Sequence, residues 1–177
     1  MTPNRIGRRN FLTLSAAAAG ALVLPASAQS PAPQAVAPAA PTKPKPDPLK
    51  PELVKEFVIA GHVDLDKVKS MLATTPALLN ASWDWGGGDF EMAIGGAGHM
   101  GRADIASFLI SQGSRFDIFV AAMLGRLDIL QPALTVNPNL ATSKGPHGIP
   151  LIVHARKGGA PAAEVLKYLE SLPPATT

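Results

Sequence analysis

A frame of apolar, small and turn residues recurs four times and constrains this chain more than any other feature. In each unit a large apolar residue is followed after three positions by a pair of mostly small residues, and three positions after the pair by a turn residue. The large apolar positions are Phe57, Ile94, Ile118 and Leu151, at spacings of 37, 24 and 33 residues. The small pairs are Ala60-Gly61, Ala97-Gly98, Ala121-Ala122 and His154-Ala155, and the turn residues are Asp64, Gly101, Gly125 and Gly158. An aliphatic residue follows the turn at Val68, Ile105, Ile129 and, with three residues inserted, Val165. Such a unit predicts two short helices that cannot bury their apolar faces alone, so neighbouring units must pack together.

Several segments match one another directly. The stretch GRADI (101–105) matches GRLDI (125–129) at four of five positions, and MLATTPALL and ALTVNPNLA share a register 62 residues apart. This frame resembles the ankyrin repeat, whose units run to about 33 residues. The likeness is clearest in AAMLGRLDIL (121–130), GRADIASFLISQGSRFD (101–117) and GIPLIVHARKGG (148–159). Pro150 and Leu151 fit the Thr-Pro-Leu-His start of that repeat, whereas Ile149 and Ile152 depart from it.

The resemblance implies an all-α fold over residues 52–172, namely a solenoid of about four degenerate helix-turn-helix repeats with short β-hairpin or loop fingers. In such a fold the first helices approach closely, which requires Ala or Gly at the paired positions. The turn glycine then ends the first helix with a positive φ, a conformation that strains other residues.

Residues 1–28 have the three zones of an export signal. Arg5, Arg8 and Arg9 supply the entire basic excess of the chain, because the remaining basic and acidic side chains number 13 each. An apolar zone of about 14 residues follows, too short for a bilayer core of about 30 Å. ASA then predicts cleavage after Ala28. Arg8, Arg9, Phe11 and Leu12 resemble the twin-arginine signal, which implies export of a folded protein to a bacterial periplasm, or secretion, with only transient membrane contact.

The rest of the composition separates a folded part from a spacer. Residues 29–51 contain eight prolines and no aromatic residue, so we expect a Pro/Ala-rich disordered linker, and a loose tail over 173–177. Residues 29–177 have no net formal charge, so they offer no basic surface that would favour nucleic acid binding. The absence of cysteine excludes disulfides and thiolate metal sites.

Gly96, Gly98 and Gly101 spell a G-x-G-x-x-G motif, which is typical of a dinucleotide-binding turn. The repeat frame explains two of these glycines as a small-pair residue and a helix-ending turn residue. The preceding stretch DFEMAI carries Asp89 and Glu91, whereas a buried parallel strand should be apolar. We therefore predict no nucleotide and no other cofactor.

The segment NASWDWGGGDF (80–90) contains both tryptophans and lies between helix pairs, where a hairpin finger is expected. Trp83, Asp84, Trp85 and Asp89 are candidate binding residues. Alternatively, one or both tryptophans cap the first unit by packing on it. A carbohydrate-binding or hydrolytic domain centred on Trp83–Phe90, with Asp84 and Asp89 as an acid/base pair, is a rival hypothesis.

Further candidates lie in other turns. In HVDLD, His62, Asp64 and Asp66 suggest metal ligands, but their alternation needs a strand, so we interpret Asp64 or Asp66 as a helix N-cap and predict no metal site. His154 stands where the family has Ala and is either buried and hydrogen-bonded or exposed at the end of the stack. The later fingers add the binding candidates Arg115, Asp117, Lys144 and His147, of which His147 is mainly interpreted as a turn residue.

Together these features predict an exported ankyrin-repeat module that binds another protein and has no catalytic residues. A structural spacer in the cell envelope, tethered by residues 29–51, is the remaining alternative.

Overall fold

The computed structural model describes residues 45–173, which belong to one compact unit, Lys45–Thr177. The predicted signal peptide with its cleavage site, the linker up to residue 44 and the last four residues of the tail lie outside the described residues. Within residues 45–173 no helix is both long enough and apolar enough to cross a membrane.

The described part is mostly helical, as the sequence predicts. Its α-helices are α1 (Pro51–Val63), α2 (Leu65–Thr74), α3 (Ala93–Met100), α4 (Ala103–Ser111), α5 (Ile118–Met123), α6 (Leu127–Val136), α7 (Leu151–Lys157) and α8 (Ala163–Ser171). Short 3-10 helices are η1 (Pro76–Asn80), η2 (Pro138–Thr142), η3 (Pro146–Gly148) and η4 (Ala160–Ala162). The strands β1 (Ser82–Asp84) and β2 (Phe90–Met92) form an antiparallel hairpin, the single sheet of this part.

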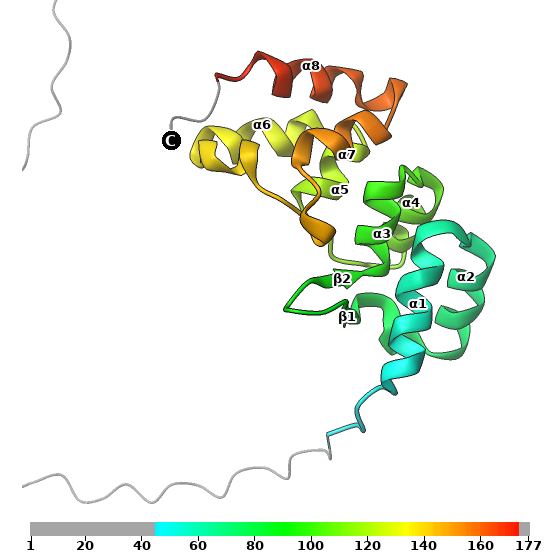
Figure 1. The fold of residues 1–177 in the computed structure, drawn as a ribbon. Coiled ribbons are helices and arrows are strands. Elements are labelled where there is room, and N and C mark those ends of the chain that lie inside the picture. Colours follow the sequence, from blue (N-terminus) through cyan, green and yellow to red (C-terminus); the bar gives the residue numbers. More distant parts are fainter. Residues whose placement is uncertain (1–44, 174–177) are drawn as a thin grey trace, which may run out of the picture. The chain divides into compact units, whose positions relative to one another are not determined.

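The helices pack in sequential pairs, α1 with α2, α3 with α4, α5 with α6 and α7 with α8. The first helices of the pairs also contact one another in chain order, so α3 packs against α1 and α5, and α5 packs against α3 and α7 (Figure 1). All eight residues of the predicted small pairs are buried, which lets these helices approach closely. A Cβ atom added to Gly61, for example, would collide with the carbonyl of Ala93 on α3.

The predicted helix-ending glycines behave in two ways. Gly101 caps α3 in the left-handed region with φ 75°, and Gly125 has φ 71°. The prediction is wrong for Gly158, whose φ is −70°; the positive φ lies one residue later, at Gly159. Glycine is still needed at 158, because a Cβ there would collide with the carbonyl oxygen of Met123.

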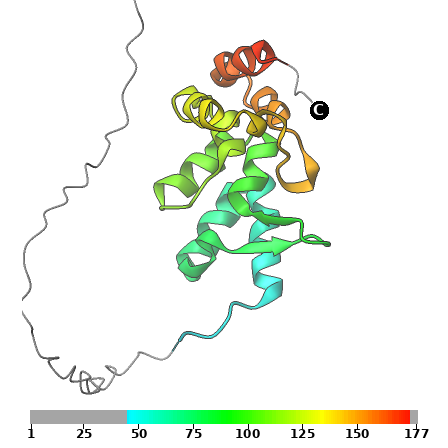
Figure 2. The same cartoon turned by 90° about the vertical axis from the view of Figure 1, so that its left-hand side faces the viewer.

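The G-x-G-x-x-G motif does not form a strand–turn–helix unit. Helix α3 begins at Ala93, so Gly96 and Gly98 lie inside it, and the strand before it belongs to an antiparallel hairpin. Figures 1 and 2 show this hairpin extending from the helices as a finger.

Candidate functional site

The hairpin predicted for NASWDWGGGDF is present, and its two tryptophans have different environments. Cross-strand pairing sets Trp83 opposite Glu91. Trp83 is partly buried against the hydrophobic core, with Lys55 Nζ 5.4 Å from its ring centroid, so it fits the packing-cap alternative. Trp85 is 36% exposed, and its Nε1 donates a hydrogen bond to Glu91 Oε2 at 2.8 Å. Asp84 accepts hydrogen bonds from the amides of Gly86 and Gly88 and so shapes the tip of the hairpin.

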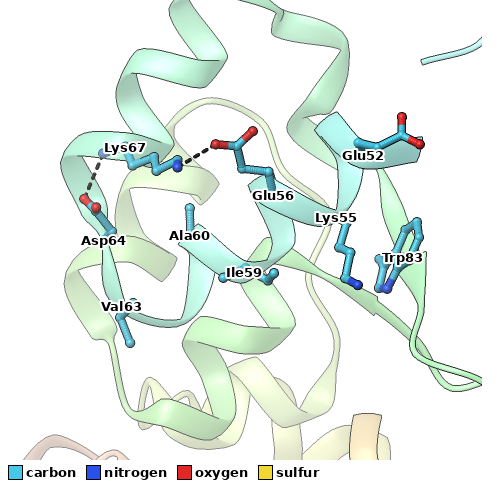
Figure 3. A pocket seen from close by; sticks show the side chains of 9 residues that line it. All are labelled: Glu52, Lys55, Glu56, Ile59, Ala60, Val63, Asp64, Lys67 and Trp83. Carbon is cyan, nitrogen blue, oxygen red and sulfur yellow. Dashed lines mark hydrogen bonds and ion pairs between the residues drawn. The ribbon is translucent and has the colours of Figure 1, made fainter. Parts of the chain in front are cut away.

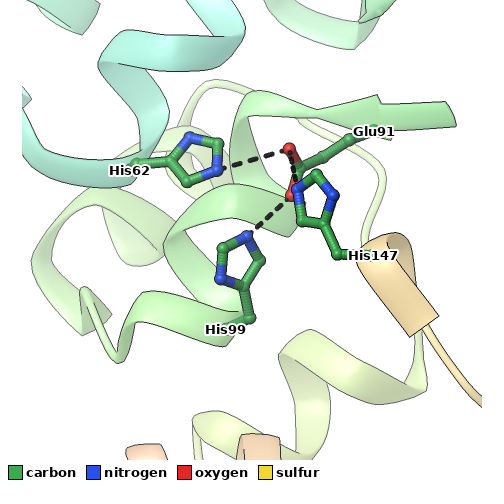
Figure 4. A group of neighbouring side chains, drawn as sticks. All are labelled: His62, Glu91, His99 and His147. Carbon is green, nitrogen blue, oxygen red and sulfur yellow. Dashed lines mark hydrogen bonds and ion pairs between the residues drawn. The ribbon is translucent and has the colours of Figure 1, made fainter. Parts of the chain in front are cut away.

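The buried carboxylate of Glu91 is the centre of a polar cluster. Glu91 is 1% exposed, and three histidine rings face the two oxygens of its carboxylate (Figure 4). His99 Nε2 lies 2.9 Å from Oε1. His62 Nε2 and His147 Nε2 each lie 3.3 Å from Oε2. We call His62, Glu91, His99 and His147 the histidine–glutamate cluster.

Four elements of the fold supply these side chains. His62 projects from the last turn of α1, Glu91 from the middle of β2, His99 from α3 and His147 from η3. The side chains of His62 and His99 approach because α1 and α3 pack together, and their ring centroids are 4.9 Å apart. Glu91 and His99 are brought together because β2 leads directly into α3.

Hydrogen bonds at Nδ1, the nitrogen that does not contact Glu91, fix the rings of His62 and His147. His62 Nδ1 donates to the Val58 carbonyl oxygen at 2.9 Å, one helical turn earlier. Asp89 Oδ1 accepts from the backbone N–H of His147, and its Oδ2 accepts from His147 Nδ1, both at 2.9 Å. Among the described residues, His147 is the single non-glycine residue with a positive φ, 58°. Such strain persists where surrounding contacts over-determine it, and it is common at functional sites.

The electrostatics of the cluster favour an ionised carboxylate. Burial by itself raises the pKa of Glu91, but hydrogen bonds with His62, His99 and Trp85 more than offset burial, so the net pKa lies well below its ordinary value. The hydrogen bond with Glu91 raises the pKa of His62 above its ordinary value, while burial of the ring opposes this change. The carboxylate therefore stays negative at neutral pH and attracts cations.

The cluster has the ligand types and the spacing of a metal site. Each of its four residues offers one ligand atom, and these atoms all lie within 4.8 Å of one another. Sequence reasoning assigned no metal-binding set, and it grouped His62 with its chain neighbours Asp64 and Asp66. Asp64 is instead the N-cap of α2, accepting from the amide of Lys67, and Asp66 is an exposed residue of the first turn of α2. The N-cap interpretation is confirmed for Asp64. His62 does not group with these two aspartates, because its ring lies beside Glu91 and His99.

Of the predicted binding residues, the fold brings Trp85, Asp89 and His147 to this cluster. Three more have other contacts: Asp117 caps α5, the Arg115 backbone N–H donates to Asn80 Oδ1, and the Lys144 backbone forms an isolated bridge with Pro150. The main interpretation of His147 as a turn residue is thus incomplete, because its ring also joins the cluster.

Sequence reasoning missed His99 entirely and did not regard Glu91 as a site residue. One signal was present in the repeat frame. His62 and His99 both directly follow the small pair of their unit, so they occupy equivalent positions on adjacent first helices. Equivalent positions of packed neighbours come close together, which predicts a histidine pair on that face.

The chain's fourth histidine, His154, lies outside the cluster. It is buried, its Nδ1 donates to the Pro150 carbonyl oxygen at 3.1 Å, and its Nε2 has no hydrogen-bond partner in the described part. Burial lowers its pKa. The alternative of an exposed residue at the end of the stack is therefore wrong.

A separate open pocket of about 590 Å³ lies beside α1 (Figure 3). Its lining residues are Glu52, Lys55, Glu56, Ile59, Ala60, Val63, Asp64, Lys67 and Trp83. Lys67 Nζ pairs with Glu56 Oε1 at 2.6 Å, so charges on its wall already compensate one another. It shares no residue with the histidine–glutamate cluster.

Comparison with protein-family models, with curated proteins and with solved structures gives no match. The geometry of the cluster is therefore the main observation from which a function can be argued.

Proposed function

We propose that this chain is an exported ankyrin-type repeat domain that binds another protein and has no catalytic activity of its own. Its binding face is formed by the β1–β2 hairpin, the carboxyl-terminal ends of α1 and α3, and the loop that contains His147. The proposal combines the repeat frame, the contacts between successive helix pairs and the chemistry gathered at this face.

The contacts between first helices support the ankyrin-type assignment. Each pair packs on the next through its first helix, and the small pairs lie buried at these contacts. An ankyrin solenoid requires this order of contacts, because each unit completes the core of its neighbour.

The convergence of the cluster residues is the observation that most favours a binding function. Packing helix pairs together requires apolar and small side chains, and it gains nothing from a desolvated carboxylate. Burying such a group costs free energy, which hydrogen bonds recover only in part. Here Glu91 is buried beside three histidines from separate segments, and Trp85 donates a hydrogen bond to it. Phe90, the preceding residue of β2, adds a 63% exposed aromatic side chain to the same hairpin. Aromatic side chains beside a polar centre are typical of binding hot spots.

The N-terminal sequence is the sole basis for including export in the proposal. The pattern at Arg8, Arg9, Phe11 and Leu12 favours the twin-arginine route and a periplasmic or secreted location. Replacing both arginines by lysine should leave the uncleaved chain inside the cell, as fractionation would detect. Processing of this variant equal to that of the parent would contradict this route.

A capture experiment tests the binding function. The exported chain is crosslinked in the periplasm, and partners are compared for the parent, for Phe90→Ser and for Val136→Ser. Val136 is 87% exposed on α6 and serves as the matched control. We expect a partner that is lost with Phe90→Ser and kept with Val136→Ser. Equal capture by all three chains contradicts this binding face. A tryptophan fluorescence change with glycans, abolished by Trp85→Ala, would favour the carbohydrate hypothesis instead.

A further inference from the structure

We propose that the histidine–glutamate cluster binds one divalent transition-metal ion, with Zn²⁺ as the representative case. This inference goes beyond the binding of a protein partner and does not depend on it. Five arguments support it: the spacing of the ligand atoms, the orientation of the rings, the charge arrangement, the strained residue His147 and the donor set.

The spacing of the ligand atoms fits a common centre. Zinc binds imidazole nitrogen and carboxylate oxygen at about 2.0–2.2 Å, so neighbouring ligand atoms of a tetrahedral site lie about 3.3–3.5 Å apart. The two contacts to Glu91 Oε2 from His62 and His147 are 3.3 Å long, and the His99 contact to Oε1 is 2.9 Å. No pair of the four ligand atoms is more than 4.8 Å apart. Small side-chain movements suffice to place all four around one ion.

The rings present the correct nitrogen to that centre. A carbonyl oxygen only accepts, so Nδ1 of His62 carries the proton donated to Val58, and Nε2 of the neutral ring holds a lone pair that faces Glu91. Asp89 holds His147 in the same way. Metal-binding histidines usually donate their second nitrogen to a carbonyl or carboxylate, and the ligating carboxylate is itself hydrogen-bonded. Trp85 provides that hydrogen bond to Glu91.

A metal ion resolves the charge arrangement better than protons do. Without a cation, two Nε2 lone pairs would face carboxylate oxygens at 3.3 Å and repel them. Adding a proton to each ring removes this repulsion but creates neighbouring imidazolium ions. The ring centroids of His62 and His147, the two rings concerned, are 6.5 Å apart. One divalent ion serves all four ligand atoms while the rings stay neutral.

The strained backbone of His147 is explained by this role. A left-handed conformation is costly for a non-glycine residue and persists at ligand-binding positions. Asp89 accepts hydrogen bonds from the backbone N–H and from the ring Nδ1 of His147, and these two bonds hold the ring toward Glu91. Its side chain, 33% exposed, is also the most accessible of the cluster, which gives an ion a way in from solvent.

The donor set determines the class of metal. Three imidazoles and one carboxylate suit Zn²⁺, Cu²⁺, Ni²⁺ and related ions, whereas Ca²⁺ and Mg²⁺ prefer oxygen ligands. The chain has no cysteine, so soft thiolate chemistry is excluded. A metal here would join α1, the hairpin with α3, and the loop before α7.

A titration of the untagged 177-residue chain tests the proposal. The chain is stripped with a chelator and titrated with Zn²⁺ against a chromophoric competitor. Co²⁺ absorption then reports the geometry at the bound ion. We expect one equivalent of Zn²⁺ per chain, no competition by excess Mg²⁺, and intense visible Co²⁺ bands typical of four-coordinate nitrogen and oxygen ligands.

Three variants make the test specific. His147→Ala and Glu91→Gln should each weaken Zn²⁺ binding by at least about tenfold and alter the Co²⁺ bands. His154→Ala removes the one histidine outside the cluster and should leave affinity and bands unchanged. Circular dichroism verifies folding, which the exposed position of His147 should preserve in His147→Ala. Absence of stoichiometric binding to the parent chain overturns the proposal, and so does undiminished affinity in folded His147→Ala.

Discussion

Asp89 and His147, 58 residues apart in the chain, are joined by two hydrogen bonds, because one carboxylate accepts from both the backbone N–H and the ring Nδ1 of the histidine. This pair fastens the loop before α7 to Asp89, the residue that directly precedes β2. The backbone conformation of His147 and the direction of its ring therefore depend on a residue from another unit.

Replacing Asp89 by alanine should release this loop. Both hydrogen bonds disappear, so the amide of His147 loses its protecting acceptor and should exchange its hydrogen with solvent much faster. Amide exchange followed by NMR measures this rate in the metal-free chain. Asp84→Ala is the matched control, because Asp84 bonds only within the hairpin turn. An unchanged exchange rate at His147 in Asp89→Ala would show that other contacts hold the loop.

Packing between first helices predicts a large cost for a bulky residue at Ala121. Ala121 is fully buried on α5, which packs between α3 and α7. Ala121→Leu should lower the free energy of unfolding by about 1–3 kcal/mol through overpacking. The control Ala163→Leu adds the same side chain at an exposed position of α8. Thermal unfolding compares the two, and equal melting temperatures for Ala121→Leu and the parent would contradict the packing account.

Because His154 is buried, we expect the free energy of unfolding to fall in acid. Burial lowers its pKa in the folded state below the ordinary value of 6.5. Below about pH 6.5 the unfolded chain therefore binds a proton that the folded chain does not, and stability falls as the pH decreases. His154→Ala removes this contribution, so its loss of unfolding free energy between about pH 7.5 and about pH 5.5 should be smaller than that of the parent. Urea unfolding with a chelator present measures both values, and identical losses would refute this role for His154.

The helical class of the fold and the sequential pairing of its helices could be predicted because they depend on local and periodic signals. Small pairs such as Ala97-Gly98 follow from how closely neighbouring helices approach, and Gly101 follows from its left-handed conformation. These requirements act within one unit or between equivalent positions of adjacent units. A single sequence therefore contains them.

The cluster could not be assembled in the same way, because its members lie on four elements separated along the chain. The sequence pattern groups His62 only with nearby aspartates, and it presents Glu91 only as evidence against the buried parallel strand of a nucleotide-binding unit. An antiparallel strand forms with Glu91 buried, because His99 and Trp85 provide hydrogen bonds to its carboxylate. The direction of the His147 loop depends on its positive φ and on Asp89, which no sequence pattern indicates.

Crystals of the untagged chain grown with Zn²⁺, measured on both sides of the zinc absorption edge, test the metal site most directly. We predict one anomalous difference peak about 2.0–2.2 Å from Nε2 of His62, His99 and His147 and from one carboxylate oxygen of Glu91. A fully loaded crystal whose peaks all lie away from these atoms, or that shows none, would contradict the account.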